Sequence, residues 1–163
     1  LNDSSYTVIG AALGGVMQKD PAKALEAARR YQNENNINLL VSVWSILAEE
    51  GNAKDNDYFL AMFDKYTTWE TYYLMIYYQQ FLEQQTDISI LKNGIDQFKT
   101  IALDDSGNWV SFFAGSFLNG IYEYFTQEIN NQDDATQAAW TTAMEYIVAT
   151  QQEIDNSYSG EEY

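Results

Sequence analysis

Paired and clustered carboxylates are the residues of this chain whose types and spacing could do chemistry. Glu49 and Glu50 are adjacent acids, and two convergent carboxylates can serve as a general acid and a general base. Neighbouring residues of a helix diverge by about 100°, so these two side chains do not face each other. We therefore interpret the pair as a solvated helix end.

Two other acidic stretches, 55–57 and 104–108, have the oxygen-rich composition of calcium loops. An EF-hand loop needs a glycine at its sixth position and a bidentate glutamate at its last. Neither stretch has both, and Asp, Asn and Ser are frequent in turns and helix caps. We favour turns and caps over ion binding for both.

The chain contains no histidine and no cysteine among its 163 residues. This composition excludes Ser-His and Cys-His nucleophilic pairs, histidine-containing zinc sites and thiol redox chemistry. We expect no catalytic residue, no metal ligand and no cofactor-binding residue here. A site made of carboxylates alone stays open, because a sequence does not show which carboxylates converge in space.

An excess of negative charge limits the partners. Twenty-four acidic residues against 8 basic ones give a formal charge of -16. Nucleic acids and anionic lipids bind clustered Lys and Arg, so we expect no nucleic-acid partner. No apolar stretch approaches the ~20 residues that span a bilayer, so we expect no membrane insertion. The only arginines, Arg29 and Arg30, fit a substrate carboxylate or, better, the C-terminal end of a helix.

Helices are the elements that must position all of these residues. Apolar residues recur at helical spacing along nearly the whole chain. Asp20 and Pro21, the only proline, are typical of a helix start. The pattern predicts about eight helices. The first follows Asp3 or Ser4, and the second runs from Pro21 to a break at the Asn-rich run 33–36. The others are predicted over residues 37–50, 57–65, 68–83, 87–103, 109–129 and 135–154.

Short connections between these helices predict the fold class. A connection of a few residues leaves no length for a crossover, so successive helices are antiparallel neighbours. We predict an all-α fold of antiparallel helix pairs, stacked as a HEAT- or armadillo-like α-solenoid or an irregular bundle. Residues 1–155 would form a single helical domain and 156–163 a polar C-terminal tail. The chain begins at Leu1 rather than Met, and we expect a fragment or a processed chain.

The first helix has an unusual composition. Its glycines, Gly10, Gly14 and Gly15, weaken an isolated helix but permit close packing against a neighbour. Its buried face is predicted to comprise Tyr6, Ile9, Leu13, Val16 and Met17.

Aromatic residues gather in the helix predicted over 68–83. This helix is apolar on two stripes, and a helix that is apolar on most sides is central or faces a partner. Either the rings form an aromatic core with hydroxyls that reach solvent, or part of the helix docks onto another domain or lines a peptide cleft. The candidate interface or peptide-cleft residues are Trp69, Tyr72, Tyr73, Tyr77 and Tyr78.

Residues 5–51 resemble the C-terminal helical domain of the M1 family of zinc aminopeptidases. The resemblance is carried by a helix that ends before the turn at Asp20 and Pro21, an "AL..A" helix after that turn, and a helix that ends in "AEEG" at Gly51. The following stretch NAKDNDYF, residues 52–59, is similar to the next inter-helix turn of the family. The resemblance covers about the first third of the chain, and the later helices match in helical character alone.

The resemblance implies a non-catalytic accessory domain that closes or shapes the peptide-binding cleft. Its partners would be the catalytic domain of the same polypeptide, which would hold the zinc, and a peptide substrate. Ala143-Met144-Glu145 matches part of the family's Gly-Ala-Met-Glu-Asn motif, but Thr142 and Tyr146 replace the flanking residues and the stretch lies in a predicted helix, so we reject it. The alternative is a free-standing α-solenoid scaffold for protein-protein interaction.

Overall fold

The computed structural model describes residues 4–67, 69–106 and 108–159. This part of the chain is all-helical and contains no strand, which confirms the predicted fold class. Two short 3-10 turns, at Ala53–Asp55 and Ile129–Asn131, accompany the α-helices. The helices are α1 (Ser4–Met17), α2 (Pro21–Tyr31), α3 (Ile37–Glu50), α4 (Asn56–Lys65), α5 (Trp69–Glu83), α6 (Ile88–Ala102), α7 (Ser111–Glu128) and α8 (Asp134–Ser159).

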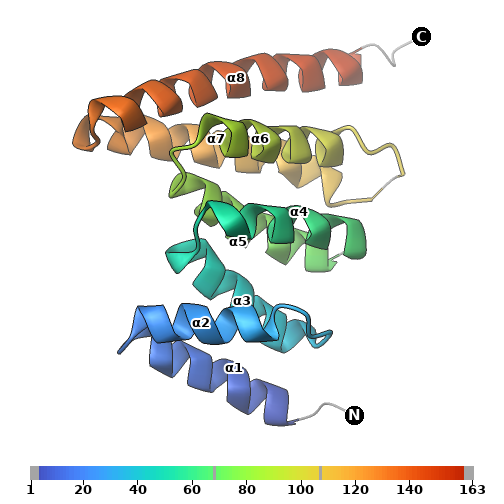
Figure 1. The fold of residues 1–163 in the computed structure, drawn as a ribbon. Coiled ribbons are helices and arrows are strands. Elements are labelled where there is room, and N and C mark those ends of the chain that lie inside the picture. Colours follow the sequence, from blue (N-terminus) through green and yellow to red (C-terminus); the bar gives the residue numbers. More distant parts are fainter. Residues whose placement is uncertain (1–3, 68, 107, 160–163) are drawn as a thin grey trace.

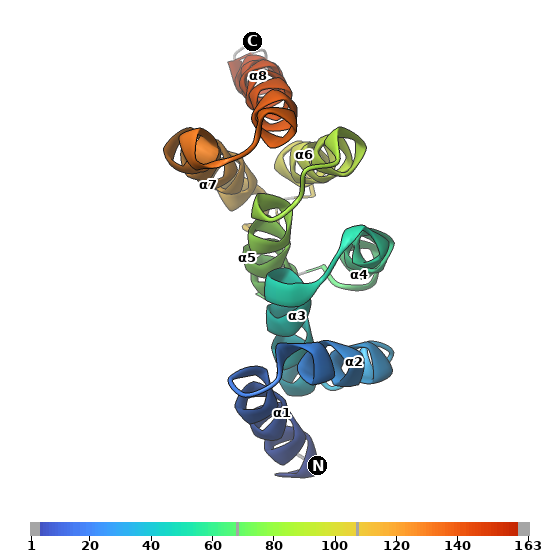
Figure 2. The ribbon, with the colours of Figure 1, turned by 60° about the vertical axis from the view of Figure 1, so that its left-hand side comes forward.

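The helices stack in two columns, from α1 at one end to α8 at the other (Figure 1). Viewed along the helices, α1, α3, α5 and α7 follow one another on one side, and α2, α4 and α6 lie on the other with α8 above them (Figure 2). Successive helices are antiparallel, so neighbours within a column are parallel. Tyr72 accordingly packs on Phe113, while Gln79, seven residues further on, faces Gly120. The architecture is a short α-solenoid of four helix pairs.

The turns between α1, α2 and α3 form as the sequence predicts. The Asp20 carboxylate accepts a hydrogen bond from the Lys23 amide at 3.1 Å, and Pro21 occupies the first turn of α2. Asn36 caps α3 by accepting from the amides of Asn38 and Leu39. These caps satisfy amides that have no partner inside the helix, which fixes where each helix begins.

Gly51 ends α3, as predicted. Its backbone is extended, and its amide donates to the Leu47 carbonyl oxygen at 3.0 Å. A Cβ at this position would lie 2.2 Å from the same oxygen. Close approach of two backbone segments therefore requires glycine here, without any left-handed conformation.

A continuous core runs along the stack and is rich in aromatic rings. Trp44 is fully buried and donates from Nε1 to the Tyr58 hydroxyl at 3.1 Å. Near the far end, Trp140 is 3% exposed, stacks on Phe125 at 4.5 Å and donates to the Gln85 carbonyl oxygen at 2.8 Å. Each buried indole N-H has an acceptor, so these large rings are buried without an unpaired donor.

Two local predictions were wrong. Val16, assigned to the buried face of α1, is 37% exposed, although Leu13 is buried and Tyr6, Ile9 and Met17 pack against the core. The last helix continues to Ser159 rather than ending near Ile154. The extra turn is held by Tyr158, whose hydroxyl donates to the Ala102 carbonyl oxygen at 2.5 Å. No helix in the described part of the chain is both long and apolar enough to cross a bilayer.

Candidate interaction surfaces

The first turns of α5 and α7 bring exposed rings together. Tyr72 of α5 lies 5.7 Å from Trp109 and 5.4 Å from Phe113, measured between ring centroids. On α5 itself, Trp69 packs edge-on against Tyr73 at 5.8 Å. We call these five residues the aromatic surface. They meet because α5 and α7 are parallel neighbours in one column, so both helices begin at the same side of the stack.

Four of the five rings of the aromatic surface are exposed, and Tyr72 between them is partly buried. Trp69 is 46% exposed, Trp109 45%, Tyr73 42% and Phe113 41%. Phe112, next to Phe113, is 75% exposed and is the most exposed large hydrophobic residue described. Contiguous apolar patches of this kind are uncommon on monomers and often mark binding sites. Aromatic residues are also enriched where proteins recognise partners.

The candidate residues predicted on α5 fall into three environments. Trp69, Tyr72 and Tyr73 belong to the aromatic surface. Tyr77 is half-buried and lines a separate groove beside Gly14 and Met17 of α1. Burial raises the pKa of the Tyr77 hydroxyl, and the neighbouring Tyr73 and Glu49 raise it further. Tyr77 therefore stays neutral at physiological pH and can donate a hydrogen bond into that groove.

Tyr78 belongs to the core. It is fully buried and donates to the Asn56 side-chain oxygen at 2.8 Å. Burial raises the pKa of the Tyr78 hydroxyl. Of the two alternatives given for the rings of this helix, core or interface, Tyr78 therefore fits the core. Its side chain is not available to a partner.

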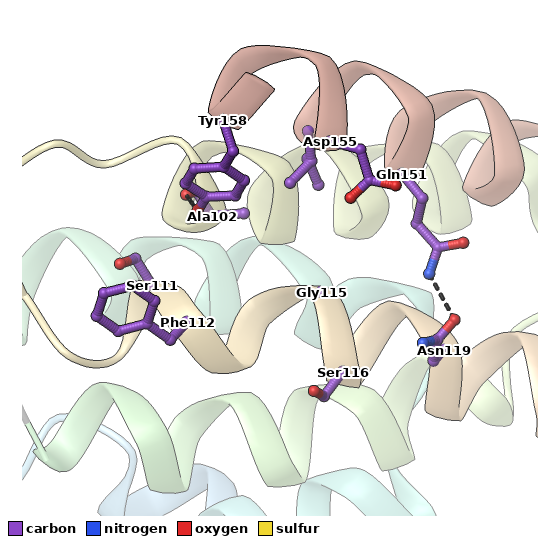
Figure 3. Close-up of a pocket in the computed structure, with 10 residues that line it drawn as sticks. Ala102, Ser111, Phe112, Gly115, Ser116, Asn119, Gln151, Asp155 and Tyr158 are labelled. Carbon is purple, nitrogen blue, oxygen red and sulfur yellow. Dashed lines mark hydrogen bonds between the residues drawn. The ribbon is translucent and has the colours of Figure 1, made fainter. Parts of the chain in front are cut away.

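A groove lies between α7 and α8 (Figure 3), and Phe112 in its lining is the sequence neighbour of Phe113 of the aromatic surface. Its volume is about 410 Å³. Asp155 and Gln151 extend from α8 toward α7, where Phe112, Gly115 and Ser116 line the opposite wall. Gln151 donates to the Asn119 side-chain oxygen at 2.6 Å and bounds one end of the groove. Phe112 thus lines the groove, while its neighbour Phe113 belongs to the aromatic surface.

Positive charge is absent from the column that carries the aromatic surface. The helices α1, α3, α5 and α7 contain no Lys or Arg, whereas α3, α5 and α7 together contain six glutamates. The cations lie on α2, α4, α6 and nearby turns, and most are held there. Lys65 donates to the Asn35 side chain at 2.8 Å, Lys99 pairs with Glu153, and Arg30 pairs with Glu26. The exposed rings therefore sit in an acidic field.

The acidic stretch 55–57 is a structural cap. Asp55 is 5% exposed and forms a bidentate ion pair with Arg29, with nitrogen-oxygen distances of 3.0 and 2.7 Å. It also accepts from the Asn52 amide at 2.8 Å. The ion pair raises the pKa of Arg29 and ties the end of α2 to the start of α4. Arg29 is thus engaged by this chain itself rather than offered to a substrate.

The second acidic stretch is a turn in its described part. Asp104 accepts from the Ser106 amide at 3.1 Å and from its hydroxyl at 2.8 Å. Gly107 of this stretch lies outside the described residues. Among the residues that the structure describes, no group of three or more Asp and Glu side chains is arranged to hold a metal ion.

The helix α1 carries a second apolar stripe that no other described element of the chain covers. Val8, Ala11, Ala12 and Gly15 follow the spacing i, i+3, i+4, i+7 and are all exposed, Val8 by 65%. A Cβ on Gly15 would meet no atom within 4 Å. Gly10, on the packed side, approaches α3 so closely that a Cβ would lie 2.8 Å from the Ser42 hydroxyl oxygen. We call the four exposed residues the α1 outer face.

Comparison of this chain with protein-family models, with curated proteins and with solved structures gives no match. The fold and its surfaces therefore carry the functional argument. They describe an acidic α-solenoid with one apolar end face, an aromatic surface and a groove between α7 and α8.

Proposed function

We propose that this chain is the non-catalytic C-terminal accessory domain of an M1-type zinc aminopeptidase, where it closes or shapes the peptide-binding cleft. The α1 outer face is the observation that supports this proposal most. Four small or apolar residues at helix-packing spacing face solvent, and α1 has no charged residue. Helices that are apolar all round are normally buried. In the proposed enzyme, the preceding part of the polypeptide covers this face.

The aromatic surface supports the second part of the proposal. In the intact enzyme, Trp69, Tyr72 and Tyr73 would face the cleft, where rings can pack against the side chains of a peptide. Zinc and hydrolysis belong to the catalytic domain, because the chain has no histidine for a zinc-binding H-E-x-x-H motif. The accessory domain would bind and orient the peptide there and exclude water from one side of the cleft.

A charge placed on the α1 outer face tests the proposal in the full-length parent polypeptide. Ala12→Glu should lower kcat/KM for peptide hydrolysis by at least about tenfold, because a buried unpaired carboxylate opposes docking. Thr7→Glu, on the same helix but off the stripe, is the matched control and should leave activity near wild type. Zinc content should be unchanged in both variants.

The parent itself provides the decisive comparison. Its reading frame should encode an H-E-x-x-H domain upstream, and it should show zinc-dependent aminopeptidase activity that the isolated chain lacks. An inactive, zinc-free parent would reject the proposal. Tyr73→Ala and Tyr77→Ala in the parent should change the KM for peptides while the variants keep wild-type stability. Unchanged KM in both would remove these two residues from the cleft.

A free-standing α-solenoid scaffold is the second candidate function. The exposed rings beside an acidic groove favour it, since such a surface can recognise a protein segment without any catalytic domain. The two candidates differ in the parent assay above. Under the scaffold function, Ala12→Glu changes no enzymatic activity and the reading frame holds no metallopeptidase domain.

A further inference from the structure

The groove between α7 and α8 has on one wall a carboxylate, Asp155, without an ion-pair partner in the described part of the chain, and on the other an exposed ring, Phe112. Asp155 takes part in none of the ion pairs found among the described residues. No Lys or Arg lines the groove, and α7 and α8 contain neither residue. Phe112 of the opposite wall keeps 75% of its surface in contact with solvent. One wall therefore offers negative charge and the other an aromatic face.

We propose that this groove and the aromatic surface bind a polypeptide segment that carries Lys or Arg beside apolar side chains. An ammonium or guanidinium group in the groove would donate charge-assisted hydrogen bonds to Asp155. The aliphatic stem of the same side chain would pack on Phe112, whose ring face also attracts a cation. Flanking apolar side chains would cover Trp109 and Phe113.

Charge complementarity selects this occupant over others. The chain carries a formal charge of -16, and its cations are confined to other helices, where Lys99 and Arg30 already have carboxylate partners. An acidic segment would be repelled, and an uncharged apolar segment would leave Asp155 beside a desolvated surface without a partner. A second copy that met this face with its own would bring the same acidic, cation-free column to the contact. A basic segment alone satisfies both the carboxylate and the rings.

The inference goes beyond the proposed function and does not depend on it, because binding is measured on this chain alone. The probe is a fluorescent, N-terminally and C-terminally blocked peptide of three Gly-Lys-Leu repeats, compared with one of three Gly-Glu-Leu repeats. Anisotropy titration should show at least about tenfold tighter binding of the lysine peptide at low salt. Raising the salt from about 0.05 M to about 0.5 M should reduce that difference, because screening shortens the range of the charges.

Matched variants separate the groove from general attraction to an acidic protein. Asp155→Asn should weaken binding of the lysine peptide by about tenfold. Glu145→Gln removes the same charge from the same helix, at an exposed position outside the groove, and should change affinity less than about twofold. Phe112→Ser should weaken binding, whereas Val148→Ser, which trims an exposed apolar residue of α8, should not.

Three results would overturn the inference. The first is equal affinity for the lysine and glutamate peptides, or no binding of either. The second is equal loss of affinity in Asp155→Asn and Glu145→Gln, which would mean that net charge attracts the peptide without a site. The third is a dimer in analytical ultracentrifugation that Phe112→Ser dissociates, because a second copy would then occupy the groove.

Discussion

The two end helices of the solenoid differ in how they meet the rest of the chain and in what they show to solvent. The helix α8 is held along its length by Trp140, which donates to Gln85, by Tyr146, which donates to Asp96 at 2.7 Å, and by Tyr158, which donates to Ala102. The helix α1 is held mainly by packing, with Leu13 as its buried anchor. Its opposite side carries the apolar α1 outer face.

The two end helices also differ in the polarity of their outward sides. Repeat proteins need a polar outer face on their terminal repeats. The exposed side of α8 carries residues such as Thr141, Glu145 and Gln152, and fits that requirement. The α1 outer face does not, because none of its four exposed residues has a polar side chain. The outward side of α8 is therefore more polar than that of α1, and α1 has a surface suited to packing against another helix.

Truncating one anchor at each end should have the largest effect on stability. Trp140→Ala removes a 3% exposed ring stacked on Phe125, and should lower the free energy of unfolding by about 3–5 kcal/mol. Leu13→Ala should cost about 2 kcal/mol, at the lower end for such truncations, because α1 has solvent behind it and can shift to fill the space. Urea unfolding of both variants measures the difference.

Trp109→Ala serves as the control for these truncations. It removes an indole that is 45% exposed, and should change stability by less than about 1 kcal/mol. A loss at Leu13 equal to that at Trp140 would contradict the comparison, because it would mean that α1 is as firmly packed as α8.

The same glycine substitution should have opposite signs at the open end and inside the stack. Gly15→Ala adds a methyl group in open space and removes a helix-weakening glycine, so it should stabilise the isolated chain by about 0.5–1 kcal/mol. Gly94→Ala would place a Cβ 2.4 Å from the Cδ1 of Leu82, which is 1% exposed. We expect a net loss of about 1 kcal/mol there, because overpacking exceeds the gain in helix propensity.

Thermal unfolding of the two glycine variants checks this contrast. Destabilisation by Gly15→Ala would show that the α1 outer face is covered in the isolated chain, for example by self-association. Sedimentation of the wild-type chain at several concentrations would then identify the contact.

Most of the fold follows from local signals in the sequence. The range of α3 was predicted to the residue, because the Asn-rich run 33–36 breaks the preceding helix and Gly51 ends α3. The eight helices and their antiparallel order follow from apolar spacing and short connections. The burial of Val16 was wrong because the sequence of α1 is apolar on both sides, so periodicity does not distinguish its packed stripe from its open one.

Three of the five residues of the aromatic surface were predicted from the sequence, and two were not. Trp69, Tyr72 and Tyr73 were recognised because a single helix holds more rings than one stripe can bury. Trp109 and Phe113 were missed, although their i, i+4 spacing places both on one side of the helix predicted over 109–129. Their significance depends on the contact with Tyr72, some forty residues away, and that contact follows only from the parallel stacking of alternate helices.

The groove was missed for a separate reason. The predicted end of the last helix near Ile154 left Asp155 outside the helix, at the edge of a polar tail. The hydroxyl of Tyr158 and the carbonyl of Ala102 lie 56 positions apart in the sequence, and their hydrogen bond is what supports the last turn. Local propensity gives no indication of such a tertiary contact, so both the helix end and the groove escaped the prediction.

The smallest of the expected effects is a loss of stability at alkaline pH through the hydrogen bond that joins α8 to α6. The hydrogen bond from Tyr146 to the Asp96 carboxylate raises the pKa of the Tyr146 hydroxyl above its usual 10.0. An acid with a raised pKa in the folded state contributes stability that is fully present below pH 10.0 and is lost as the pH rises through the folded-state pKa. An experiment with Tyr146→Phe tests this, because the variant lacks the hydroxyl and so lacks this contribution.

The difference in unfolding free energy between wild type and Tyr146→Phe should therefore be constant at neutral pH and shrink above pH 10.0. Other buried tyrosines, such as Tyr58, whose pKa burial raises to about 12, ionise in both proteins and cancel in that difference. A difference that stays constant through the alkaline range would mean that this hydrogen bond does not tether α8, and would leave the distinction between the two ends to packing alone.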